Sequence, residues 1–327
     1  MSAFRATIFG CKGLTLSDNE RAFYREARPF GFILFGRNIE SAPQVRALCD
    51  ALRGCVAHEA PILIDQEGGR VQRFRPPLAT EWVPPLEQVR AAGVHAERVM
   101  YLRSLIMAHE LRALGVDANC APLVDVARDE THPFLKNRCY GDNPDLVTRV
   151  GRSVANGLRD GGVLPVIKHI PGHGRAVADS HLDLPRVAAS VEALENDFAP
   201  FTALNDIPMG MTAHLVYEAL DTEPATHSAR VMGLIRNQIG FDGLIMTDDI
   251  SMQALSGPVS ERASKSIAAG CDVVLHCNGE FDEMQDVATA SGVLSGLGLI
   301  RAHAALAARQ PPETVDIQAL TAEFKAF

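Results

Sequence analysis

The sequence lacks the features that mark several large classes of protein. No apolar stretch reaches the length of about 18 residues that a transmembrane helix needs, and the N-terminal apolar run is too short for a signal peptide. Aromatic residues make up only 6%, the net charge is −9, and no block of Lys or Arg occurs. A nucleic acid or an anionic membrane would require a concentration of positive charge. We therefore expect a cytoplasmic protein with neither kind of partner.

Motifs for metals and nucleotides are also missing. The seven cysteines form no CxxC pair, so we expect reduced thiols rather than disulfides or a zinc site. HExxH, GxGxxG and GxxxxGK[ST] are absent, which removes the usual anchors for zinc and nucleotides. Several histidines and aspartates could still gather around a metal, and a metal-dependent hydrolase therefore stays an alternative to the metal-free site that we expect.

Short apolar runs recur along the chain, and most of them precede a segment of helical periodicity. Their apolar character on both faces is typical of parallel strands that are covered on each side. The predicted strands are 4–9, 31–35, 61–65, 116–121, 164–168, 209–213, 243–247 and 272–276. The clearest predicted helices are 43–56, 96–114, 146–158, 228–239 and 261–269, with Ser228 as an N-cap and Gly115, Gly240 and Gly270 at helix ends.

This alternation predicts a (β/α)8 TIM barrel, formed by one catalytic domain over residues 1–327. A barrel of this kind places its chemistry where the strands end. Polar and charged residues do follow the predicted strands at Asp65, Asp125, Lys168, His214 and Asp248. Random placement would also put them on helix surfaces, so this pattern favours an enzyme.

The loop after the fifth strand is unusually rich in titratable groups. It contains His173 between two glycines, and then Asp179 and His181. A carboxylate can orient a histidine and support its protonated form, which suits general acid–base catalysis. A solvated loop pair is the competing interpretation, and His173 fits a loop-shaping role.

Several strand-end residues have both a functional and a structural interpretation. Lys168 and His169 end a buried strand, where they either bind a ligand or pair with a structural carboxylate. Asp65 and Arg73 flank a glycine turn, and each of them either binds a ligand or forms a salt bridge at the rim of the site. Asp248 is a candidate nucleophile, whereas Asp249 fits a capping role better. We expect His109 to pack inside a helix interface.

Five segments of the chain resemble the glycoside hydrolase family 3 β-N-acetylhexosaminidases, specifically the single-domain members of peptidoglycan recycling. They occur in the family's order and span most of the chain. The segments are GFILFGRN (31–38), LIDQEGGRVQRF (63–74), KNRCYGDNP (136–144), IKHIPGHGRAVADSHLDLP (167–185) and LIMTDDISM (244–252). Cys139, Tyr140, Ile170 and Thr247 depart from the common residues but keep approximate size or polarity.

The resemblance implies a role for each matching residue. Asp248 is similar to the catalytic nucleophile, and His181 to the general acid/base that Asp179 orients. The residues similar to those that bind the terminal N-acetylglucosamine are Asp65, Arg73, Arg138, Lys168 and His169. The family uses no metal or organic cofactor and retains anomeric configuration through a covalent glycosyl-enzyme.

We therefore expect a monomeric exo-β-N-acetylglucosaminidase whose small-molecule substrate is an N-acetylglucosaminyl-1,6-anhydro-N-acetylmuramic acid peptide. An N-acetylglucosaminide phosphorylase is a close alternative, because a histidine acid/base does not repel phosphate as a carboxylate does. A non-catalytic sugar-binding barrel is the alternative from another class, although the joint presence of Asp248, Asp179 and His181 disfavours it.

Overall fold

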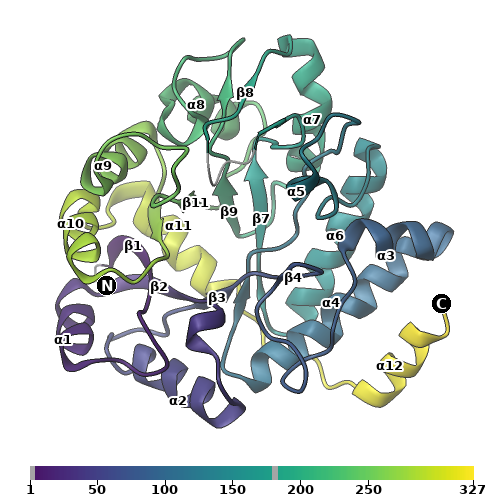
Figure 1. The fold of residues 1–327 in the computed structure, drawn as a ribbon, viewed down its shortest axis with the longest axis horizontal. Helices are drawn as coiled ribbons and strands as arrows, with labels where there is room; N and C mark the ends of the chain where they lie inside the picture. The colour runs from purple at the N-terminus through teal and green to yellow at the C-terminus, as the bar shows by residue number, and fades with distance from the viewer. Residues whose placement is uncertain (1–3, 179–182) are drawn as a thin grey trace.

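Eight parallel strands form a closed barrel at the centre of the computed structural model, which describes residues 4–178 and 183–327. Helices surround the strands on all sides in the view of Figure 1. The barrel strands are β1 (Arg5–Gly10), β2 (Pro29–Leu34), β3 (Ile62–Ile64), β6 (Ala118–Asn119), β7 (Leu164–Ile170), β9 (Met209–Thr212), β11 (Leu244–Asp249) and β12 (Val273–His276). Each overlaps a strand predicted from the sequence, and the (β/α)8 fold is confirmed.

The strands pair in chain order, and β1 closes the barrel by pairing with both β2 and β12. Two small additional sheets lie outside the barrel. One is the antiparallel hairpin β4 (Gln66–Gly68) with β5 (Val71–Gln72), and the other pairs β8 (Arg186–Val187) with β10 (Val216–Tyr217). The hairpin follows β3 directly, so it lies at the end of the barrel where chemistry is expected.

The helices follow the strands as the alternating pattern requires. Their bounds are α1 (Asp18–Ala27), α2 (Ala42–Arg53), α3 (Pro85–Ala92), α4 (Ala96–Ala113), α5 (Pro133–Lys136), α6 (Pro144–Asp160), α7 (Val191–Ala203), α8 (Ala229–Asn237), α9 (Val259–Ala269), α10 (Phe281–Ser291), α11 (Gly296–Ala307) and α12 (Ile317–Lys325), with short 3-10 turns η1 (Gly36–Asn38), η2 (Gly93–His95) and η3 (Ala225–His227). Ser228 caps α8 by accepting a hydrogen bond from the Val231 N–H at 3.0 Å, as predicted. Gly270 ends α9 with φ at 115°, a conformation that favours glycine.

Strand residues alternate between two hydrophobic cores. On β1, Ala6 and Ile8 belong to the cluster that fills the barrel, whereas Phe9 belongs to the cluster between the strands and the helices. Both faces of the strands are therefore apolar, which explains the continuous apolar runs in the sequence. One packing prediction was wrong: His109 is exposed on α4.

No helix in residues 4–178 and 183–327 is both long and apolar enough to cross a bilayer. The α12 helix lies beside α4 at the periphery, where Arg98 and Glu323 form a two-bonded ion pair with both N–O distances at 2.7 Å (Figure 1). This contact is remote from the ends of the barrel strands in the same view.

Candidate active site

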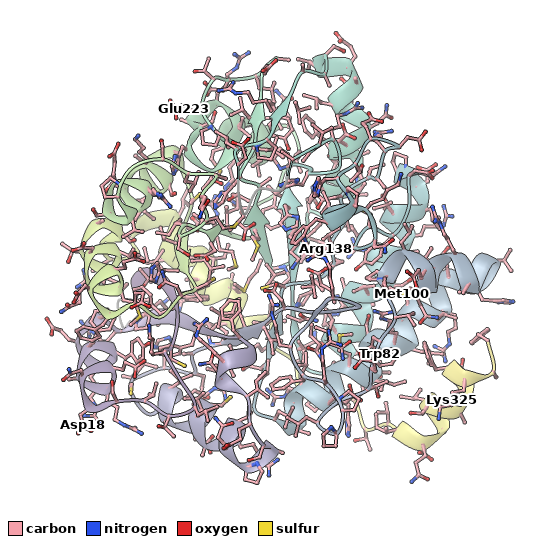
Figure 2. The ribbon with its side chains drawn as sticks, in the orientation of Figure 1. Asp18, Trp82, Met100, Arg138, Glu223 and Lys325 are labelled. Carbon is pink, nitrogen blue, oxygen red and sulfur yellow. The ribbon has the colours of Figure 1, made fainter. Side chains whose placement is uncertain are left out.

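A cavity of about 380 Å3 opens at the carboxyl ends of the barrel strands. Six of the residues predicted to act in a site line it, and they lie in β7 and β11, directly after β3 and β5, and in the loop between α5 and α6. These residues are Asp65, Arg73, Arg138, Lys168, His169 and Asp248. Figure 2 shows Arg138 near the middle of the molecule, over the barrel. Asp179 and His181, the predicted acid–base pair, lie outside the described residues.

One wall of the cavity is a chain of alternating charges. The Lys168 ammonium lies 2.9 Å from Asp65 Oδ1 and 2.6 Å from Glu67 Oε1. Glu67 also accepts two hydrogen bonds from the Arg138 guanidinium, each at 2.9 Å, and Asp65 accepts one from Arg73 at 3.0 Å. The structural interpretation is therefore confirmed for Asp65, Arg73 and Lys168, which form ion pairs and also line the cavity.

This charge chain is largely removed from water, and its pairing fixes its protonation. Burial alone would raise the pKa of Asp65, but Lys168 and Arg73 outweigh it and hold that pKa well below its usual range. Burial would also raise the pKa of Glu67, but Arg138 and Lys168 outweigh burial and lower that pKa to about 2. Burial would lower the pKa of Lys168, and the two carboxylates instead raise it. These groups stay charged near neutral pH and can bind polar hydroxyl groups.

Glu67 is a residue of this wall that the sequence did not predict. Its buried side chain contacts both Lys168 and Arg138 but is not among the residues that line the cavity. Glu67 lies within the segment 63–74 that resembles the family and follows a predicted strand. Its spacing, however, does not distinguish it from an exposed loop residue.

A second wall carries imidazole groups held by a buried aspartate. His169 Nδ1 lies 2.7 Å from Asp125 Oδ2, and the backbone N–H of His173 donates to Asp125 Oδ1 at 2.6 Å. Since an ionised carboxylate can only accept, Nδ1 of His169 is the donor in this contact. His173 shapes the loop as expected through its backbone. Its ring also lines the cavity, and burial, then His169, lower its pKa to about 4.

Asp248 lines the same cavity, near the end of β11. From the described part of the chain, its carboxylate receives one hydrogen bond, at 2.8 Å from the N–H of Asp249 to Oδ1. Burial would raise its pKa, but His214 and His169 outweigh that effect and lower it. A carboxylate that is ionised and hydrogen-bonded through one oxygen atom has the properties of a nucleophile.

Asp249 has a structural role, but it does not cap a helix as predicted, because the next helix, α9, begins after Pro258. Its carboxylate accepts hydrogen bonds from the Ser251 N–H at 3.1 Å, the Ser251 hydroxyl at 2.6 Å and the Cys277 N–H at 3.2 Å. Its carbonyl lies 3.1 Å from His214 Nε2. Asp249 therefore fastens the turn after β11 to β12 and holds its neighbour Asp248 in place.

The described residues contain no cluster of three or more His, Cys, Asp or Glu side chains arranged to hold a metal ion. Of the carboxylates that line the cavity, Asp65 is engaged with two cations of the protein, Arg73 and Lys168.

Comparisons with known proteins match this architecture over most of the chain. The Glycosyl hydrolase family 3 N terminal domain matches residues 16–303. The chain belongs to glycoside hydrolase family 3. A β-hexosaminidase of Alkalilimnicola ehrlichii is 39% identical over 283 residues, covering 83% of this chain and 80% of the relative.

Solved structures agree with that assignment. NagZ from Neisseria gonorrhoeae, in complex with N-trifluoroacetyl-D-glucosamine, is 29% identical with a TM-score of 0.87, covering 99% of this chain and 96% of NagZ. A family 3 β-N-acetylglucosaminidase from a Paenibacillus species is 30% identical with a TM-score of 0.82, covering 98% of this chain and 61% of the other. This family 3 protein is therefore a glycoside hydrolase of the β-hexosaminidase type.

Proposed function

We propose that the protein is a retaining exo-β-N-acetylglucosaminidase that removes a terminal N-acetylglucosamine residue from muropeptides bearing 1,6-anhydro-N-acetylmuramic acid. The observation that carries this proposal is that an ionised Asp248 and a set of paired charges line one cavity at the strand ends. A terminal sugar offers several hydroxyl groups to such a wall, and its anomeric carbon needs a carboxylate nearby.

The sugar-binding wall would act before the chemistry. Asp65 can accept hydrogen bonds from sugar hydroxyls, while Arg73, Arg138 and Lys168 can donate to hydroxyl or carbonyl oxygens. The ion pairs among these groups fix the wall before substrate arrives. These side chains therefore need little rearrangement when the substrate binds, and such preorganisation is typical of a catalytic site.

The reaction would proceed in two displacements. Asp248 attacks the anomeric carbon while an acid protonates the departing oxygen, which breaks the glycosidic bond and forms a covalent glycosyl-enzyme. The same group then removes a proton from water, which attacks the anomeric carbon and releases Asp248. We assign that acid/base role to His181 and its orientation to Asp179, because the segment 167–185 resembles the family's acid–base loop.

The related proteins support N-acetylglucosamine as the sugar and a β-glycosidic bond as the bond that is cleaved. The Neisseria NagZ was solved with an N-acylglucosamine analogue, and the Paenibacillus protein is named as a β-N-acetylglucosaminidase. The cell-wall substrate follows from the resemblance to the peptidoglycan-recycling members. The cytoplasmic location, the monomeric state, the extent of the single catalytic domain and the lack of a cofactor stay predictions.

Hydrolysis of a chromogenic β-N-acetylglucosaminide and of a purified anhydromuropeptide tests the proposal. We expect release of N-acetylglucosamine whose first-formed anomer is β, detected by proton NMR, with and without phosphate in the buffer. Formation of a sugar 1-phosphate would show a phosphorylase instead, and release of an α anomer would contradict the double displacement. Binding of the sugar without turnover would indicate a non-catalytic barrel, and loss of activity with a chelator would indicate a metal-dependent hydrolase.

A further inference from the structure

Arg103 on α4 is a fully buried cation close to the sugar-binding wall but outside the cavity. Its exposed fraction is 1%, and it contacts the β4–β5 hairpin that carries Glu67. Among the described residues it forms no ion pair with a carboxylate. Burial lowers its pKa to about 10, although Tyr140 and Glu67 oppose that shift. A buried cation without a paired carboxylate is costly for folding, so its retention calls for a specific task.

The contacts of Arg103 identify that task. Its Nη2 donates to the carbonyl of Glu67 at 2.6 Å and to the carbonyl of Val83 at 2.9 Å. Its guanidinium carbon also lies 5.3 Å from the centre of the Trp82 ring. One side chain thus ties the hairpin to the segment that leads into α3. Figure 2 shows Trp82 and Met100 on the same side of the molecule, between Arg138 and the peripheral α12.

The hairpin is built to admit this side chain. Gly68 has φ at 107°, and a Cβ atom there would lie 1.8 Å from Arg103 Nη2. No side chain larger than hydrogen fits at Gly68 while Arg103 stays in place. The sequence of the hairpin and the arginine of α4 are therefore matched to each other.

The Glu67 carbonyl is directly coupled to the sugar-binding wall. The same residue holds Lys168 and Arg138 through its side chain, and Asp65 lies two residues earlier in the chain. A shift of the Glu67 backbone would displace the carboxylate that two cations share. A displacement of about 1 Å in a binding group can cost up to roughly 100-fold in rate.

We propose that Arg103 is a positioning residue of the sugar-binding wall. It holds the backbone of Glu67 and thereby fixes the positions of Lys168 and Arg138. This inference rests on the proposed function, because it assumes that the wall binds the terminal sugar. Arg103 itself does not touch the substrate. Its effect should therefore fall on sugar binding more than on the chemical steps at Asp248.

Competitive inhibition by N-acetylglucosamine measures the state of the wall separately from turnover. For Arg103→Met we expect the inhibition constant and KM to rise roughly 10-fold to 100-fold, while kcat changes much less. Arg103→Lys keeps a donor for one of the two carbonyls and should give a smaller rise. Gly68→Ala should reproduce the Arg103→Met effect, whereas Gly93→Ala should not, since Gly93 also has a positive φ but its Cβ would meet nothing within 4 Å.

A core variant of the same helix separates positioning from general destabilisation. Leu111→Ala, at a fully buried position of α4, should lower Tm as much as Arg103→Met does. At a temperature where both variants are folded, Leu111→Ala should leave the inhibition constant unchanged. If Arg103→Met is poorly folded, Arg103→Lys and Gly68→Ala carry the same comparison.

An unchanged inhibition constant in Arg103→Lys and Gly68→Ala, or an equal rise in Leu111→Ala, would overturn the inference while leaving the proposed function intact. Absence of any hydrolysis by the unaltered protein would overturn the proposed function, and this inference with it. A fall in kcat without a rise in the inhibition constant would also contradict a positioning role on the sugar side.

Discussion

The two sides of the cavity differ in how completely their charges are satisfied. On the side where we propose that the sugar binds, the carboxylates of Asp65 and Glu67 each contact two cations, and Lys168 is shared between them, so that three cations serve the two carboxylates. At the end of β11, Asp248 receives one hydrogen bond from the described residues. Saturated charges hold their geometry, whereas an under-coordinated carboxylate is free to react. We therefore expect the paired groups to bind the substrate and Asp248 to perform the chemistry.

The largest effect should come from Asp248. Asp248→Asn keeps the size of the side chain but removes the nucleophile, so kcat should fall by about 10^4-fold or more. The inhibition constant of N-acetylglucosamine should change little, because the opposite wall is intact. Steady-state kinetics on a chromogenic N-acetylglucosaminide measure both quantities. Turnover near that of the unaltered protein would remove Asp248 from the nucleophile role.

His181→Ala should have the next largest effect on catalysis. Loss of a general acid/base costs roughly 10^2-fold to 10^4-fold, and substrates with poor leaving groups should suffer most because they need protonation. A series of aryl N-acetylglucosaminides with different leaving-group pKa values tests this dependence. An equal loss across the series would show that His181 does not donate a proton to the leaving group.

Removing a carboxylate from the ion-paired side of the cavity should mainly lower the free energy of unfolding. Glu67→Gln leaves Lys168 and Arg138 without their shared anion, and losing one partner of a buried pair costs about 3–5 kcal/mol. Glu97→Gln is the matched control, since Glu97 pairs with Arg149 on the surface and exposed pairs contribute at most about 1 kcal/mol. Urea denaturation gives both free energies of unfolding. Equal losses in the two variants would contradict the assignment of Glu67 as a buried anchor.

The smallest predicted effect concerns pH and His173. Burial, then His169, lower the pKa of His173 to about 4 in the folded protein, against about 6.5 when unfolded. The unfolded chain therefore binds a proton that the folded chain does not, and stability present above pH 6.5 is lost as the pH falls toward 4. The contribution of His173 is on the order of 3 kcal/mol.

His173→Gln should flatten this pH dependence in urea titrations between pH 7 and pH 4. The slope should not vanish, because the pKa values of His58, His214 and His227 are also lowered, by burial first. His95→Gln, at an exposed position, should leave the slope unchanged. A slope in His173→Gln identical to that of the unaltered protein would show that His173 titrates as it does in water.

The sequence was sufficient for the fold because its signals were local and repeated. Each barrel strand is an apolar run between polar segments, and both faces of β1 are buried exactly as such a run requires. The strand-end pattern also located Asp65, Lys168 and Asp248 in one site. These inferences needed only the rule that parallel strands end at one face of a barrel.

The remaining parts of the site depend on contacts between distant residues. Glu67 and Arg138 are 71 positions apart, and Asp125 and His169 are 44 apart. No periodicity reports such pairs. The role of Arg103 was hidden for the same reason, since an arginine on a helix is most often a surface residue. His109 was assigned to a packed interface because it stands among apolar residues, but the rotation of α4 exposes it.

Trapping of the glycosyl-enzyme tests the assignment of the two sides most directly. A 5-fluoro-N-acetylglucosaminyl fluoride should inactivate the protein with time, and peptide mass spectrometry should find the sugar on Asp248. The same reagent should leave Asp65 and Glu67 unlabelled, because their oxygens are held by cations. A label on either of those carboxylates, or turnover with no covalent adduct, would contradict the account.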